Sequence, residues 1–175
     1  EAAAVERWVR GGGSLMLIAD HEPWPLMASR LSSRFGVEFK NAYVYDGDRP
    51  GNLILFRKPD GTMADHPVTS GVDTVATFLG SAFRVTGVHV PLLRLSPAGV
   101  ARPAIGNTPQ DGEEAIGGWL QGALLERGQG RVGVFAEAAL FTAQVRGGRA
   151  MGMNAPDAPG NVRLLRNVMR WLTRV

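Results

Sequence analysis

The order of apolar segments over the first 39 residues constrains the fold more than any other feature of the chain. Residues 2–10 carry apolar side chains at helical spacing, and the glycines at 11–13 end that segment. Residues 14–19, SLMLIA, then form a continuous apolar run, which is typical of a strand covered on both faces in a parallel sheet. A second helical segment reaches Phe35, and VEF at 37–39 has the composition of a short strand. This alternation of helix and strand predicts an α/β layered sheet.

The rest of the chain has a looser pattern. We expect irregular connections at residues 41–52, 57–74, 96–117 and 146–160, where glycine, proline, asparagine and charged residues gather. We expect strands at 53–56, 75–80 and 91–95, a β-hairpin made of 119–126 and 131–136, and a last helix at 161–173. No internal repeat or domain boundary interrupts the pattern, so residues 1–175 are predicted to form a single domain.

Composition excludes several kinds of site. Cysteine is absent from all 175 residues, which excludes disulfides, thiolate metal sites and a cysteine nucleophile together. The 19 basic and 16 acidic residues give a net charge of only +3, so we expect no nucleic-acid partner. No apolar run approaches the roughly 18 residues that a membrane span needs, so we expect no membrane span in this chain. Composition leaves the cellular location open, extracytoplasmic or not, and indicates no cofactor.

Four segments together resemble one known superfamily. They are GGGSLMLIADH at 11–21, HPVTSGV with TFLGSAF at 66–83, GRVGVFAEAALFTAQ at 130–144, and the end from Asn154 through GNVRLLRNVMRWL. These segments resemble class I glutamine amidotransferase-like domains, in particular the ThuA-like, GldG and IFT-associated branch. The resemblance implies a flavodoxin-like three-layer sandwich with a mainly parallel sheet and a C-terminal β-hairpin. It also implies that a β-α-β portion precedes the first strand, so that this chain is a fragment of a longer one.

The same resemblance excludes the chemistry for which the superfamily is known. Catalytic amidotransferases carry a cysteine on the sharp turn, or elbow, after the first of these strands, and a His-Pro-Glu segment after a later one. The elbow here carries Asp20 and His21, and the later segment reads Phe135-Ala136-Glu137, which keeps the acid but lacks the histidine. Without a thiolate or an imidazole to activate it, glutamine hydrolysis by the family mechanism is excluded. The chain is expected to be a catalytically degenerate member.

Polar residues gather at the expected carboxyl ends of the strands, where α/β folds place their ligand sites. We expect Asp20, His21 and Glu22 to bind a ligand there, with Glu137 opposite and Asn154 on a neighbouring loop.

A structural alternative stays open at this point. Asp20 or Glu22 could cap the helix that begins near Pro23, and Glu137 could be the first-turn acid of the segment that follows it. One carboxylate could also cap a helix while another faces the crevice.

Two further patterns concern metal binding and anion binding. The histidines at 21, 66 and 89 lack metal-ligand spacing, so a metal site of His21, Asp20 and Glu137 would need separate loops to converge, and we predict no metal. The arginines at 163, 166, 170 and 174 share one face of the last helix. This face could bind an anionic partner, but a solvated face explains it as well, and we favour the solvated face.

Two classes of function follow from these residues. The first is a non-catalytic domain that binds a ligand, with carbohydrate suggested by ThuA-like relatives, or a protein partner at the crevice near the elbow. A missing N-terminal segment of the chain is another candidate occupant. The second is a hydrolase or lyase in which Asp20 or Glu137 works with His21 as acid and base.

Overall fold

The computed structural model describes residues 1–106 and 111–175, and its helices are short. The α-helices are α1 (Ala2–Arg10), α2 (Trp24–Ser32) and α3 (Asn161–Thr173). Single turns of 3-10 helix are η1 (Ser33–Phe35), η2 (Pro67–Thr69) and η3 (Ala139–Phe141). In the described part of the chain, no helix is long and apolar enough to cross a membrane.

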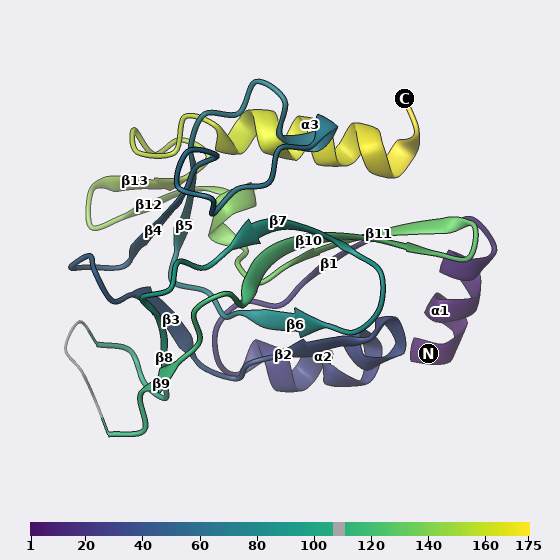
Figure 1. The fold of residues 1–175 in the computed structure, drawn as a ribbon, viewed down its shortest axis with the longest axis horizontal. Helices are drawn as coiled ribbons and strands as arrows, with labels where there is room; N and C mark the ends of the chain where they lie inside the picture. Colours follow the sequence, from purple (N-terminus) through teal and green to yellow (C-terminus); the bar gives the residue numbers. More distant parts are fainter. Residues whose placement is uncertain (107–110) are drawn as a thin grey trace.

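Strands make up the larger part of the regular structure (Figure 1). The first seven are β1 (Ser14–Ile18), β2 (Val37–Phe39), β3 (Tyr43–Asp46), β4 (Leu53–Phe56), β5 (Val75–Phe78), β6 (Phe83–Val85) and β7 (Val90–Arg94). The rest are β8 (Gly99–Arg102), β9 (Glu114–Ala115), β10 (Leu120–Arg127), β11 (Gly130–Phe135), β12 (Ala143–Arg146) and β13 (Arg149–Gly152).

The main sheet is mixed, not mainly parallel. Its order is β1-β11-β10-β6-β2, and β7 pairs with β10 beside this path. Among the described strands only β1 and β11 run parallel; the other pairs are antiparallel. The remaining strands form small separate sheets, β12-β13, β3-β8-β9 and β4-β5. The predicted flavodoxin-like three-layer sandwich is therefore wrong, because the main sheet is mixed with one parallel pair among the described strands, and the chain has several small sheets and three short α-helices.

The predicted hairpin and end helices are confirmed. β10 and β11 pair from Gly122↔Phe135 to Arg127↔Gly130, and the turn between them uses Gly128 at φ +62°. The first and last helices have the predicted bounds, because each carries an apolar stripe that is long enough for the 3.6-residue period to be unmistakable.

The core lies on both faces of the main sheet. Helix α3 buries Leu164, Val168 and Leu172 on one face, whereas α1 lies toward the other face and buries Val9 there. Figure 1 shows α3 and the α1–α2 pair on opposite sides of the sheet. β11 lies between these two layers, and all of its residues except the half-buried Arg131 are buried, which explains the apolar run from Val132 to Phe135.

Several predicted loops contain short strands instead. Segment 41–52 contains β3, segment 96–117 contains β8 and β9, and segment 146–160 contains β13. β6 was not predicted at all. Residues 107–110 of the predicted excursion lie outside the described part of the chain. These strands have two to four residues each, too few for an alternating pattern; β13 pairs with the adjacent β12, and the others pair with strands farther along the chain.

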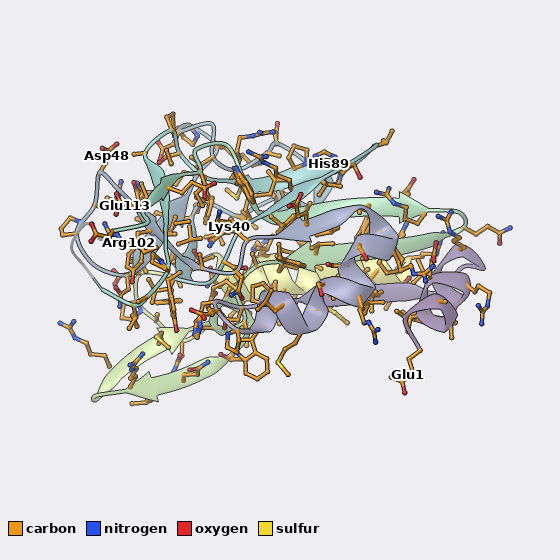
Figure 2. All side chains as sticks on the ribbon, turned by 90° about the horizontal axis from the view of Figure 1, so that it is seen from below. Glu1, Lys40, Asp48, His89, Arg102 and Glu113 are labelled. Atoms are coloured by element: carbon orange, nitrogen blue, oxygen red, sulfur yellow. The ribbon has the colours of Figure 1, made fainter. Side chains whose placement is uncertain are left out.

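A buried arginine holds the small sheet β3-β8-β9 together. Arg102 donates from Nε to Glu113 at 2.6 Å, and its guanidinium carbon lies 4.4 Å from the centre of the Tyr45 ring. Nearby, Lys40 forms an ion pair with Glu114 of β9. Figure 2 labels Lys40, Arg102 and Glu113 near this end of the molecule. The charge of Arg102 can stay buried because its donors have partners.

Candidate functional site

Two carboxylates meet at the carboxyl ends of the one parallel strand pair. Ile18 of β1 pairs with Phe135 of β11, and the Ala19 N–H donates to the Phe135 carbonyl at 3.1 Å. Continuing this register by two residues brings Asp20 level with Glu137. Asp20 is near enough for its negative charge to raise the pKa of Glu137, while the shared ligand site predicted for these two acids stays a prediction.

Asp20, His21 and Glu22 form the elbow itself, and all three are half-buried. Asp20 Oδ1 accepts the backbone N–H of His21 at 2.8 Å. The N-terminus of α2 receives no side-chain cap, so the expectation that Asp20 or Glu22 caps this helix is wrong. The reason is local: the proline pair around Trp24 starts the helix without the need for a side-chain acceptor at its first turn.

The His21 ring has a fixed position. Its Nδ1 lies 2.7 Å from the Glu22 carbonyl, and since a carbonyl only accepts, Nδ1 carries the hydrogen. The ring stacks on Tyr43 of β3 with 4.5 Å between ring centres and 20° between planes. This stack packs the elbow against the small sheet β3-β8-β9. The ring is held by this stack and by Nδ1, not by Nε2.

Glu137 is buried and serves as a cap. It is 1% exposed, and its two oxygens accept the N–H groups of Ala139 at 2.7 Å and Leu140 at 2.6 Å, in η3. Burial raises the pKa of Glu137 from 4.5 to about 8, and the negative charge of Asp20 adds to the rise. Hydrogen bonds from backbone N–H groups, Leu140 first, lower the pKa but do not offset the burial. Glu137 therefore binds the first N–H groups of η3 from a position before its first turn, so it is not the first-turn acid that the structural alternative described.

A buried polar network supports the same region and was missed from the sequence. Gln121 accepts from Thr77 Oγ1 at 2.7 Å and donates to the carbonyls of Leu79 at 2.9 Å and Ser81 at 2.7 Å. Leu79 has φ +77°, an uncommon conformation for a side chain of its size. The signal for this network was Gln121 itself, a polar residue inside the apolar run WLQGALLE.

Asn154 does not join the other predicted residues by any hydrogen bond that the structure describes. It is exposed after β13, and its Nδ2 donates to the Gln144 carbonyl at 3.4 Å. No group of three or more histidine and carboxylate side chains is placed to hold a metal within residues 1–106 and 111–175. The predicted carbohydrate ligand stays a prediction.

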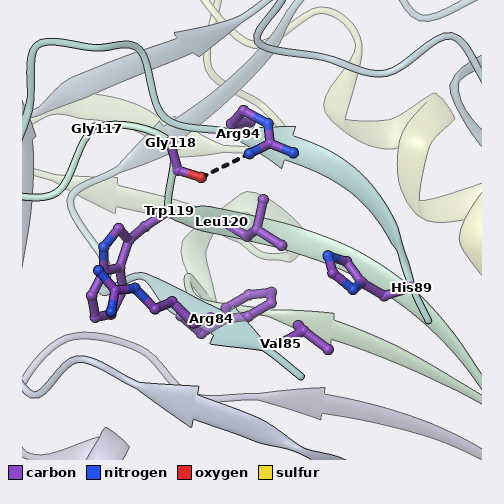
Figure 3. A pocket seen from close by; sticks show the side chains of 9 residues that line it. Arg84, Val85, His89, Arg94, Gly117, Gly118, Trp119 and Leu120 are labelled. Carbon is purple, nitrogen blue, oxygen red and sulfur yellow. Dashed lines mark hydrogen bonds between the residues drawn. The ribbon is translucent and has the colours of Figure 1, made fainter. Parts of the chain in front are cut away.

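A cavity of about 440 Å³ lies at a different place, where the main sheet divides. β10 pairs with β6 only at Leu120↔Phe83, whereas its pairing with β7 runs from Leu120↔Arg94 to Leu124↔Val90. Figure 3 shows Arg94 reaching the carbonyl of Gly118 and Arg84 beside the ring of Trp119. The guanidinium carbon of Arg84 lies 4.1 Å from the centre of that ring. Both arginines therefore have structural partners at this cavity.

Comparison with known proteins gives matches at the level of structure. No protein-family model and no curated protein sequence matches the chain. A solved structure described as the mmIFT52 N-terminal domain matches with a TM-score of 0.65 at 13% identity, over 98% of this chain and 70% of that one. The cytoplasmic protein STM3548 from Salmonella typhimurium matches with a TM-score of 0.54 at 14% identity, over 98% of this chain and 59% of that one.

A thua-like protein from Bacteroides uniformis also matches, with a TM-score of 0.49 at 16% identity, over 98% of this chain and 62% of that one. This TM-score is too low to carry an argument. The predicted resemblance is confirmed in its coarser form: the chain shares the fold of the mmIFT52 N-terminal domain and of STM3548. At such identities a common fold carries no activity from one protein to another.

Proposed function

We propose that this chain is a non-catalytic interaction domain that binds an amphipathic helix of a protein partner along α2, directly after the elbow. The observation that carries the proposal is the exposure of large apolar side chains on this helix. Trp24 is 52% exposed, Leu26 63% and Met27 71%. Neighbouring apolar side chains of this size on the surface of a protein mark interaction sites.

The other two helices make the contrast clear. α3 is strongly amphipathic, with Leu164, Val168 and Leu172 buried and its arginines outside, whereas α1 buries Val9 and leaves one large apolar side chain, Trp8, 54% exposed. α2 buries Pro25 against the domain, and its exposed side carries the apolar Trp24, Leu26 and Met27 beside the polar Ser29 and Arg30. Covering the exposed side of α2 is therefore favourable, at roughly 25 cal/mol for each Å² of apolar surface removed from water.

A groove beside α2 indicates the chemistry of the partner. A cavity of about 770 Å³ runs between α1 and α2, with Val5, Met27 and Leu31 among its apolar lining. Arg30, Arg34 and Glu1 line the same groove, and because Arg34 is paired with Glu6 at 3.4 Å, the basic character of its border comes mainly from Arg30. A helix that lays leucine-like side chains into this groove and carries glutamates at its edges fits both features.

A second candidate function is acid–base catalysis at the elbow, which the raised pKa of Glu137 beside Asp20 favours. It ranks second because Glu137 is 1% exposed and both of its oxygens already accept backbone N–H groups. A substrate proton cannot reach either oxygen unless this part of the chain opens. With no cysteine in the chain, the family nucleophile is absent as well.

The test uses designed peptides as probes. Two fluorescent 18-residue amphipathic helices share a leucine face and differ in carrying glutamate or lysine at its edges. Binding is measured by fluorescence anisotropy at two salt concentrations. We expect the glutamate peptide to bind more tightly than the lysine peptide, and to weaken when salt screens Arg30 and Arg34.

Matched variants locate the binding. Met27→Asp places a charge in the groove and should abolish binding, whereas Val145→Asp changes an equally exposed apolar residue on the distant β12 and should not. If neither peptide binds, or if both variants weaken binding equally, the proposal is refuted. Thermal unfolding of both variants checks that each is folded.

A further inference from the structure

The outer face of α3 borders a cavity rich in arginine that is separate from the elbow and from α2. The cavity has a volume of about 580 Å³ and is lined by Arg131 of β11, by Arg163 and Arg170 of α3, by Arg174 directly after α3, and by residues around η2. This volume lies within the range of small-molecule sites. No carboxylate side chain is among the residues that line it.

Three of the four cationic groups at this cavity lack an ion-pair partner. In residues 1–106 and 111–175, Arg163, Arg170 and Arg174 form no ion pair, whereas Arg131 lies 3.6 Å from Glu126. α3 contains no acidic residue, so its own sequence supplies no counter-charge. Four guanidinium groups around one cavity repel one another, and an anion between them removes that cost.

Two of the arginines are held in place by the fold. Arg131 donates from Nη1 to the Trp171 carbonyl at 2.6 Å and lies over the Trp171 ring. Its Nε is buried without a hydrogen-bond partner, since the nearest carboxylate, Glu126, is 3.6 Å away. Arg163 packs against Gly71, where a Cβ atom would come 2.8 Å from Nη1. The backbone at Gly71 therefore leaves room for this guanidinium.

We infer that this cavity is an anion site for a small molecule that carries phosphate groups. Guanidinium forks match the oxygens of a phosphate in pairs, which a lysine ammonium does not. Asn167 holds the opposite wall, because its Nδ2 donates to the carbonyls of Val68 at 3.0 Å and Ser70 at 3.1 Å. The site needs no residue of the elbow or of α2, so it is independent of the proposed function.

A structural explanation competes with this assignment. Basic residues in the last turn of a helix offset the negative end of its dipole, and Arg170 occupies that turn. Such a role predicts no saturable ligand binding and no difference between arginines on this helix. Arg166 provides the comparison, since it belongs to the same helix but does not line the cavity.

The experiment titrates the protein with inorganic phosphate, pyrophosphate and ATP by calorimetry at 150 mM salt. We expect saturable binding of pyrophosphate or ATP, with the affinity at least tenfold lower in Arg163→Gln/Arg170→Gln. Arg166→Gln should stay within twofold of the wild type, and Arg170→Lys should lie between the two. A third arm uses vesicles that contain phosphatidic acid, which present the same phosphate on a membrane surface.

Each outcome decides the assignment. Saturable binding of a soluble phosphate that follows the cavity arginines supports it. Absence of saturable binding, equal losses in Arg166→Gln and the double variant, or binding only to the vesicles overturns it. Circular dichroism and thermal unfolding confirm that the variants are folded, so that a loss of affinity is not a loss of structure.

Discussion

The buried carboxyl of Glu137 should make the protein less stable as the pH rises. Its pKa is 4.5 in the unfolded chain and about 8 in the folded one, so the folded state holds the proton more tightly. The stabilisation is complete below pH 4.5 and is lost as the pH rises through 8. At about 1.36 kcal/mol for each pH unit, the full effect is at most about 5 kcal/mol, and the loss between pH 5 and 7 is about 2.5 kcal/mol.

The assay is urea unfolding of the wild type and of Glu137→Gln at pH 5, 6, 7 and 8. The variant has no proton to lose, so the contribution of this site to the slope disappears. At pH 5 the free energy of unfolding of Glu137→Gln should be about 1–3 kcal/mol lower than that of the wild type. In the wild type the two carboxyl oxygens accept the N–H groups of Ala139 and Leu140, whereas the amide nitrogen of glutamine cannot accept, so one of these N–H groups loses its partner. The gap should close as the pH rises, since only the wild type loses stability at this site.

The difference in the free energy of unfolding between the wild type and Glu137→Gln is a better test than the pH dependence of either protein alone. Burial lowers the pKa of His66, so that group destabilises the folded state as the pH falls and acts in the opposite direction. Subtracting the free energy of unfolding of Glu137→Gln from that of the wild type at each pH removes the contribution of His66. Glu38→Gln, on the exposed face of β2, should keep the pH dependence of the wild type. Parallel curves for the wild type and Glu137→Gln between pH 5 and 8 would refute the reasoning.

Two further substitutions test the supports of the elbow. Gln121→Ala leaves the carbonyls of Leu79 and Ser81 without their donor and should lower the free energy of unfolding by about 2–4 kcal/mol, as measured by urea unfolding. Gly80→Ala puts a Cβ atom 2.5 Å from a backbone oxygen at φ +79°, and in thermal unfolding it should cost clearly more than Gly147→Ala. Gly147 also has a positive φ but has open space around it, so its substitution should cost only about 1–2 kcal/mol; equal losses would contradict the steric argument.

The candidate site was predictable in part. The apolar run before Asp20 and the run before Glu137 placed both acids at strand ends, and the structure brings them together. The sequence could not decide which acid caps a helix, because that depends on which backbone N–H groups lie nearby. The sequence also contains no signal that Asn154 lies apart from Asp20, His21, Glu22 and Glu137. Asn154 follows the hairpin β12-β13, and the position of this hairpin depends on its packing against other parts of the chain.

The sequence by itself determined the elements whose pattern is local. The stripes of α1 and α3, the apolar runs of β1 and β11 and the glycine turn of the β10–β11 hairpin were all readable, because each signal lies within a few residues. Only the tertiary structure decided the direction of the neighbouring strands. A buried strand is apolar whether its neighbour runs parallel or antiparallel, so the sheet order and the small sheets come from long-range pairing. The same packing buried Glu137 and left the apolar side of α2 exposed.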